Sequence, residues 1–127
     1  MRIQVDTDFL IYALSQVGPE RIRLRRAAES EASLQISAIA WYEFCRGPRL
    51  PEHIAVARSL FGVDGVVPFD ETLAAQTADV FRRLGSPRRR SADIAIGVTA
   101  AATPAVLLTR NARDFAGIPG LELEAVS

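Results

Sequence analysis

The segment from Ser91 to Thr109 constrains the fold of this 127-residue chain more than any other part of it. Ser91–Ala102 contains almost only small or apolar residues, which predicts a helix buried on several sides. Ala105–Thr109 then forms a continuous apolar run, the pattern of a central parallel strand covered on both faces. Parallel strands need crossover connections, usually helices, so we expect strands and helices to alternate along the chain.

The other segments fit that alternation. Short apolar runs predict further strands at Arg2–Val5, Leu34–Ile36, Val66–Phe69 and, at the edge of the sheet, Leu121–Val126. Helical spacing and capping residues predict helices over Phe9–Leu14, Glu20–Ala32, Ser37–Arg46, Pro51–Phe61 and Asp70–Leu84, with a polar loop at Ser86–Arg90 and a turn at Asn111–Gly120. The prediction is a single α/β domain over residues 1–127, a three-layer α/β/α fold with a mostly parallel central sheet.

Composition excludes several classes of function. Fifteen basic and fifteen acidic residues cancel, so attraction to an anionic partner must come from local clusters. All the basic residues are arginine, which excludes every mechanism that needs a lysine. One cysteine, Cys45, and one histidine, His53, cannot build a disulfide, a zinc cluster or a multi-histidine site, and we expect a cytoplasmic protein. No apolar stretch predicts a membrane helix, and Asp6 and Asp8 interrupt any signal-peptide core.

Four acidic residues lie inside or against apolar segments: Asp6, Glu43, Asp93 and Asp114. An ionised carboxylate does not enter low-dielectric surroundings alone, because its desolvation is costly. Ligands of open parallel sheets bind beyond the carboxyl ends of the strands, and Asp6, Asn111 and Asp114 follow strand ends. Asp93 lies in the first turn of the helix before the core strand, which a right-handed crossover starts from the same edge, and Glu43 lies on the helix after the second strand. Carboxylates gathered there would repel each other unless a divalent cation neutralised them, and oxygen-only ligands favour magnesium or manganese.

Each of these residues also has a purely structural interpretation. Asp93 could cap its own helix or pair with a neighbouring arginine. Glu43 could pair with Arg46 at i,i+3 spacing. Asp114 could be a turn residue that bonds local backbone, and so could Asn111. Spacing alone therefore leaves a metal site and a set of structural acids both open.

Three segments resemble the PIN domain, and more narrowly the VapC toxins of bacterial toxin–antitoxin pairs: Val5–Ile11, Ala92–Ile96 and Leu108–Phe115. The last of them, Leu-Thr-Arg-Asn-x-x-Asp-Phe, is the most distinctive, and the resemblance extends over essentially the whole chain. It implies a PIN-like fold and a magnesium-dependent endoribonuclease that cleaves RNA phosphodiester bonds. It also implies a homodimer and inhibition by a small VapB-like antitoxin.

The resemblance also assigns roles to residues. Asp6, Glu43 and Asp93 match the three acidic positions of the family. Asn111 stands where many members have aspartate, and Asp114 follows one turn later, so the fourth position is open between them. The implied roles are catalysis for Asp6, Glu43, Asp93 and Asp114, binding of Mg²⁺ or Mn²⁺ for Asp6 and Asp93, and orientation of ligands for Thr7 and Asn111.

Arginines flank the acidic segments, and guanidinium groups can contact phosphate bidentately. Candidate RNA contacts are Arg46, Arg49, Arg88, Arg89, Arg90, Arg110 and Arg113. The alternative is that these are solvated surface charges. Asp8 departs from the residues usual in the family and is assigned no role. The aromatic residues around Glu43, namely Trp41, Tyr42 and Phe44, belong either to the core or to a partner surface.

Two other functions stay open beside a toxin. One is a PIN-family nuclease that processes RNA, which the absence of a neighbouring antitoxin gene would favour. The other is a non-catalytic binding module, which the absence of magnesium or manganese binding would favour. Haloacid dehalogenase-type phosphatases and response-regulator receivers also place acids at strand ends, but both need a lysine.

Overall fold

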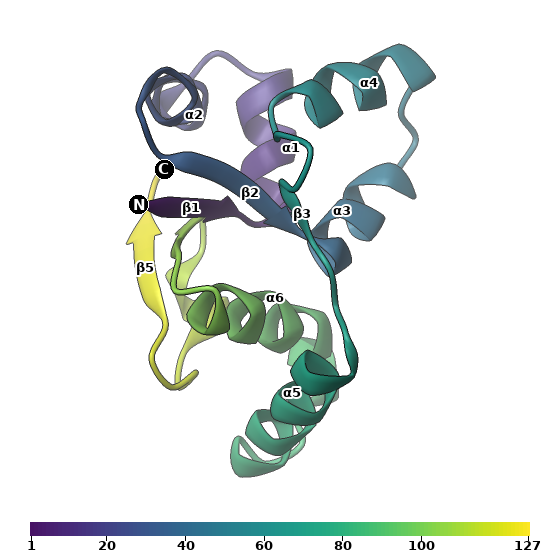
Figure 1. Cartoon of the computed structure of the whole chain (residues 1–127), viewed down its shortest axis with the longest axis vertical. Coiled ribbons are helices and arrows are strands. Elements are labelled where there is room, and N and C mark those ends of the chain that lie inside the picture. The colour runs from purple at the N-terminus through teal and green to yellow at the C-terminus, as the bar shows by residue number, and fades with distance from the viewer.

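Strands and helices alternate in the computed structural model of the protein, which describes residues 1–127 (Figure 1). The strands are β1 (Arg2–Val5), β2 (Ser33–Ser37), β3 (Val66–Val67), β4 (Val106–Thr109) and β5 (Glu122–Ala125). The α-helices are α1 (Thr7–Ser15), α2 (Pro19–Glu29), α3 (Ala38–Cys45), α4 (Pro51–Ser59), α5 (Glu71–Arg83) and α6 (Ser91–Ala102), and the 3₁₀ helices are η1 (Arg88–Arg90) and η2 (Ala112–Phe115). The predicted alternation is confirmed. None of the helices has the length and apolar character that crossing a membrane requires.

The five strands form one sheet in the order β3-β2-β1-β4-β5, and every neighbouring pair is parallel. β1 lies in the centre, where Val5 is aligned with Ile36 of β2 and with Leu108 of β4. β2 and β3 extend to one side of β1, whereas β4 and β5 extend to the other. The strand order therefore reverses between β1 and β4, and this is the place where parallel sheets bind ligands.

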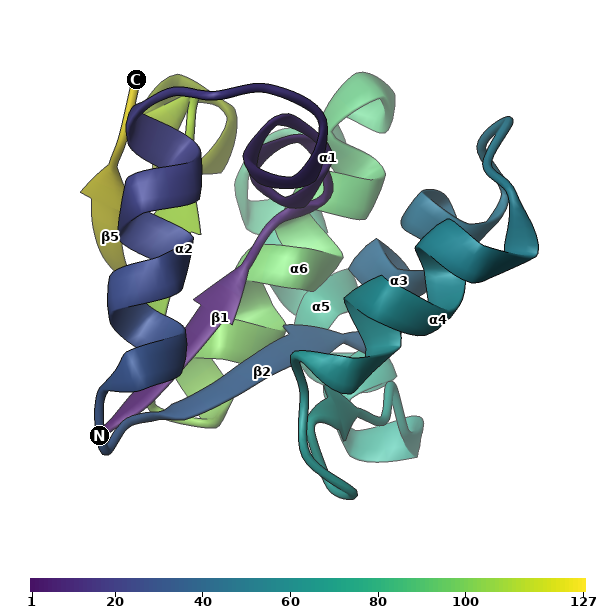
Figure 2. The ribbon, with the colours of Figure 1, turned by 90° about the horizontal axis from the view of Figure 1, so that it is seen from above.

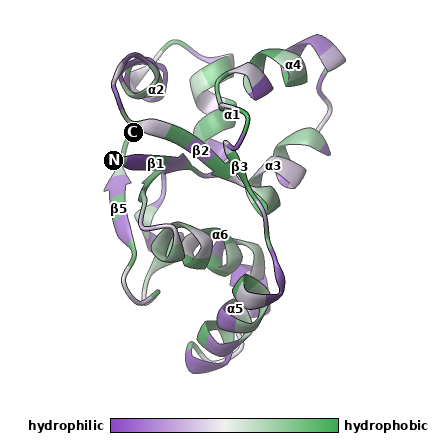
Figure 3. Ribbon diagram, in the orientation of Figure 1, coloured by the Kyte–Doolittle hydropathy of each residue, from purple (hydrophilic) through white to green (hydrophobic).

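Helices cover both faces of the sheet, as a three-layer α/β/α fold requires. In two perpendicular views α1, α2 and α4 lie on one face and α5 and α6 on the other (Figures 1 and 2). Figure 3 shows apolar residues along much of α6, whose residues Ile94–Ala100 are all buried. The helix predicted to be buried on several sides is thus confirmed, and it leads into the buried strand β4.

Three local features differ from the predictions. The third strand was expected to reach Phe69 but ends at Val67, because Pro68 has no N–H to continue the ladder. The stretch predicted as a loop contains η1, which leads directly into α6. The predicted turn after β4 likewise contains η2. Both 3₁₀ helices lie next to residues with candidate functional roles.

Candidate active site

One cavity of about 610 Å³ collects the candidate residues of the sheet edge. It is lined by Asp6, Thr7, Asp8, Ile11, Glu43, Arg46, Gly47, Pro48, Arg49, Asp93, Arg110, Asn111 and Asp114. Only one of these residues is hydrophobic, and five are acidic. The residues come from the ends of β1 and β4, from α1, α3, α6 and η2, and from the connection between α3 and α4, which are far apart in the sequence.

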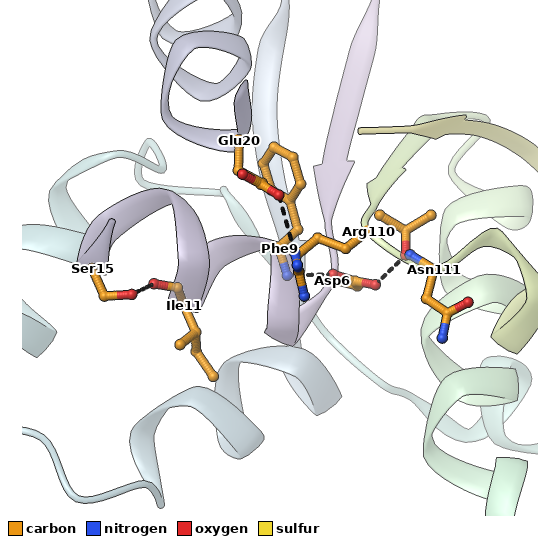
Figure 4. Close-up of polar contacts among 8 residues, drawn as sticks. Asp6, Phe9, Ile11, Ser15, Glu20, Arg110 and Asn111 are labelled. Carbon is orange, nitrogen blue, oxygen red and sulfur yellow. Dashed lines mark hydrogen bonds and ion pairs between the residues drawn. The ribbon is translucent and has the colours of Figure 1, made fainter. Parts of the chain in front are cut away.

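Asp6 is the N-cap of α1 and has both carboxylate oxygens engaged. Its Oδ1 accepts a hydrogen bond of 2.7 Å from the backbone N–H of Phe9, and its Oδ2 accepts one of 2.6 Å from the hydroxyl of Thr109 (Figure 4). The residue is only 7% exposed, and this burial raises the pKa of Asp6 to about 6. The two hydrogen bonds lower that pKa, whereas the charges of Asp8 and Asp114 raise it. Asp6 is therefore a capping residue whose ionisation is costly.

Asp93 lies in the first turn of α6 without a stabilising partner. α6 has no side-chain capping hydrogen bond, and Asp93 forms no ion pair with the arginines before it. Burial raises the pKa of Asp93 to about 7, with further increases from the charges of Asp114, Glu43, Asp6 and Asp8. Asp93 therefore neither caps its helix nor pairs with an arginine, the two structural roles that its sequence position allowed. What remains is a carboxylate surrounded by other carboxylates.

Glu43 projects from α3 and is held by Thr7. The Thr7 hydroxyl donates a hydrogen bond of 2.7 Å to Oε1 of Glu43. Nη2 of Arg46 lies 3.8 Å from Oε2 of Glu43, which is long for an ion pair, and the Arg46 side chain is 59% exposed. This ion pair therefore contributes little to stability. Phe44 is buried and stacks with Trp41 at 5.7 Å between ring centroids, which anchors α3 in the core. Of the aromatic residues around Glu43, Tyr42 alone is largely exposed.

Asn111 and Asp114 both face the cavity from the segment after β4. The backbone N–H of Asn111 donates to the Thr109 hydroxyl at 3.0 Å, and the N–H of Asp114 donates to the Asn111 carbonyl at 3.1 Å. Asp114 makes the largest contribution of any neighbouring charge to the raised pKa of Asp93. Asp114 therefore supplies the negative charge of this segment, and Asn111 supplies a neutral amide.

The seven candidate arginines have different surroundings. Arg46, Arg49 and Arg110 line the cavity, whereas Arg88, Arg89, Arg90 and Arg113 do not. Arg110 donates from Nε to the carboxylate of Glu20 at 3.0 Å, and its guanidinium carbon lies 3.5 Å from the centroid of the Tyr12 ring (Figure 4 shows the Glu20 contact). Arg49 donates to the carbonyl of Phe44 at 2.7 Å. These two cavity arginines are thus largely occupied by contacts within the protein.

The donor set suits a hard divalent cation. Carboxylate and amide oxygens line the cavity, with no histidine or cysteine, and two of the carboxyl groups have pKa values raised by burial and mutual repulsion. No three of the acidic side chains are arranged around a common point in this conformation. A bound cation would therefore require these carboxylates to come closer together than they are in this conformation.

Residues 3–121 match the PIN domain. This chain belongs to the PIN domain family. PIN domains are nucleases and generally use divalent metal ions. The match includes every residue that lines the cavity, from Asp6 to Asp114.

Solved structures with this fold come from toxin–antitoxin complexes. A chain of VapBC2 from Rickettsia felis, bound to a DNA fragment from its promoter, has a TM-score of 0.75 and 20% identity over 98% of each chain. A chain of the toxin–antitoxin complex from Klebsiella pneumoniae has a TM-score of 0.72 and 25% identity over 94% of each chain. A chain of DNA-bound VapBC from Salmonella typhimurium has a TM-score of 0.70 and 25% identity over 98% of each chain. No curated protein matches the sequence of this PIN domain.

Two polar residues at or beside this cavity were not predicted from the sequence to have a role in it. Asp8 lines the cavity and raises the pKa of both Asp6 and Asp93. Its position in the first turn of the helix that Asp6 caps was a signal for this role. Thr109 holds Asp6, and a sequence signal existed here too, because the last residue of a strand lies beside the end of its parallel neighbour.

Proposed function

We propose that this PIN domain, a single domain over residues 1–127, is a metal-dependent endoribonuclease and the toxin of a type II toxin–antitoxin pair. The observation that carries the proposal is the unpaired Asp93, which lies in a cavity with four other carboxylates and has a pKa of about 7. Such crowding is unfavourable in a purely structural site, and it is expected in a site that binds a cation. The resemblance to chains of toxin–antitoxin complexes supports the toxin role.

Each of the acidic cavity residues would have its own role in the reaction. Asp6 and Asp93 would hold Mg²⁺, or alternatively Mn²⁺, which when bound would neutralise charge and favour attack of water on a phosphodiester. Thr7 donates to Oε1 of Glu43, so the proton of the attacking water would go to Oε2, which Arg46 approaches at 3.8 Å. Asn111 would orient ligands, and Asp114 would complete the set of catalytic acids. The expected products carry a 3′-hydroxyl and a 5′-phosphate.

The partners follow from the same proposal. RNA phosphates would meet Arg46 at the cavity rim and exposed arginines outside it, including Arg88, Arg89 and Arg113. A small VapB-like antitoxin would neutralise the enzyme, and two copies of the chain would form a homodimer. We place this activity in the cytoplasm, where its RNA substrate is found.

Incubation of total RNA with antitoxin-free protein tests the nuclease proposal. We expect discrete new 5′ ends with Mg²⁺ present and none after chelation. Asp93→Asn should abolish cleavage, whereas Asp64→Asn should not, because Asp64 is exposed and lies outside the cavity. Cleavage that survives both the chelator and Asp93→Asn would refute the proposal.

Expression in living cells tests the toxin role separately. The proposal predicts growth arrest by the wild-type chain, relief by a small gene encoded beside it, and no arrest by Asp93→Asn. RNA cleavage without growth arrest would instead indicate a PIN nuclease that processes RNA.

A further inference from the structure

Arg90 joins the two segments that carry Asp93 and Asp114. We propose that Arg90 is a positioning residue that fixes the segment after β4 relative to the start of α6. This inference rests on the proposed function, because it concerns the geometry of the same site. It assigns Arg90 a role different from the RNA contact expected from the sequence.

The contacts of Arg90 run between two site segments that are separate in the sequence. Arg90 occupies the N-cap position of α6, one helical turn before Asp93. Its Nε donates to the backbone carbonyl of Asp114 at 3.4 Å, and its Nη2 donates to the carbonyl of Ala116. Both carbonyls lie at the end of η2, where helical carbonyl groups lack intrahelical partners. The guanidinium group thus satisfies these carbonyls and attaches η2 to α6.

A second attachment lies on the other side of Asp93 along α6. Gly97 packs so closely against the segment after η2 that a Cβ atom there would lie 2.5 Å from Cδ1 of Ile118 and 3.4 Å from Cδ1 of Phe115. Phe115 and Ile118 are both buried. Asp93 therefore lies between two attachments of the same segment. Without Arg90 only the apolar attachment remains, and the Asp114 turn gains freedom to move away from Asp93.

The surroundings of Arg90 favour positioning over direct contact with phosphate. Two of its nitrogen atoms already donate to backbone carbonyls, and it forms no ion pair with any carboxylate. Its neighbours Arg88 and Arg89 are exposed and have no side-chain hydrogen bond or ion pair. The arginine run therefore divides into two outward residues available to RNA and one inward residue that binds the protein itself.

Arg58 offers a matched control. It caps backbone carbonyls in the same manner, with Nη1 donating to Phe61 at 2.7 Å and to Gly62 at 3.1 Å. These carbonyls belong to the connection before β3 and lie outside the cavity. Arg58→Ala should therefore remove a comparable set of hydrogen bonds without changing the geometry around Asp93.

The experiment compares Arg90→Ala, Arg90→Lys and Arg58→Ala by RNA cleavage kinetics and by calorimetric titration with Mn²⁺. We expect Arg90→Ala to lower kcat by roughly 10-fold or more with KM within about 2-fold of wild type, because misplaced catalytic groups reduce the rate steeply. The affinity of Arg90→Ala for Mn²⁺ should also fall. Arg90→Lys should have a kcat and a Mn²⁺ affinity between those of Arg90→Ala and wild type, and Arg58→Ala should keep the wild-type values of both.

Three results would overturn the inference. The first is an Arg90→Ala variant with wild-type kcat and Mn²⁺ affinity. The second is an increase in KM alone, which would make Arg90 an RNA contact. The third is an equal loss in Arg58→Ala, which would indicate a general effect of lost stability. A wild-type protein that cleaves no RNA would refute the proposed function instead, while the Mn²⁺ titrations of the variants would still test the role of Arg90.

Discussion

Oδ2 of Asp6 accepts a hydrogen bond of 2.6 Å from the hydroxyl of Thr109, the last residue of the neighbouring strand. This bond joins the ends of β1 and β4 at the point where the strand order reverses. Together with the N–H of Phe9 it fixes the orientation of a buried carboxylate. Asp6 therefore enters the cavity in a defined geometry.

Thr109→Val should destabilise the protein at pH 7. The substitution preserves shape but removes both the donor to Oδ2 of Asp6 and the acceptor of the Asn111 N–H. Leaving a buried polar group without its partner costs about 1–3 kcal/mol. Thr99→Val is the control, since the buried Thr99 hydroxyl donates only to the carbonyl of Ala95 in its own helix. Urea unfolding measures both variants. Equal losses of unfolding free energy would contradict a special role of the Thr109 bond.

The metal-free protein should lose stability as pH rises from about 4 to about 7. The pKa values of Asp6 and Asp93 are raised to about 6 and about 7 in the folded state, so the folded protein binds these protons more tightly than the unfolded chain. Their stabilising contribution is complete below pH 4 and disappears as each carboxyl ionises. Asp93→Asn should reduce this pH dependence, and Mg²⁺ should stabilise the wild type at pH 8 more than the variant. Identical pH profiles of unfolding free energy for both proteins would contradict the prediction.

Much of this architecture is predictable because it depends on local pattern. The apolar run Ala105–Thr109 and the small-residue helix before it specify a buried parallel strand and its crossover. Asp6 and Asp114 follow strands, which places them at one edge of the sheet. The third strand was predicted too long because its apolar run continues past Pro68, which interrupts the ladder.

The contacts that organise the site were harder to predict. Arg90 stands in a run of three arginines that looks like solvated charge, and only the tertiary fold directs it to the carbonyls of η2. Arg110 similarly reaches Glu20 across 90 positions of sequence. Neither pairing has a local sequence signal, because neither partner lies at helical or strand spacing.

Gly97→Ala should destabilise the protein by about 1–3 kcal/mol, as expected for overpacking of a close contact. The added methyl would lie 2.5 Å from Cδ1 of the buried Ile118, so either the Ile118 side chain must repack or α6 and the segment after η2 must separate. Gly62→Ala is the control, since a Cβ there meets no atom within 4 Å. Chemical denaturation compares the two variants, and an unchanged midpoint for Gly97→Ala would show that this contact is not tight.

The double substitution of Arg88 and Arg89 by alanine should weaken RNA binding and its dependence on salt. Each lost phosphate contact on a single strand reduces the slope of log K against log salt by about 0.7, so the pair should reduce it by about 1.4. Fluorescence anisotropy in an Asp93→Asn background measures binding without cleavage. Alanine at both Arg82 and Arg83 is the control, because these residues share Asp79 as an ion-pair partner. A slope that falls equally in both double variants would count against Arg88 and Arg89 as the contacts.

Calorimetric titration of the purified protein with Mn²⁺ tests most directly whether the scattered carboxylates form one metal site. We predict saturable binding by the wild type, a loss of affinity of roughly 10-fold or more in Asp93→Asn, and wild-type affinity in Asp64→Asn. The absence of binding by the wild type, or equal affinity in Asp93→Asn, would contradict the account and favour acids that serve a structural role.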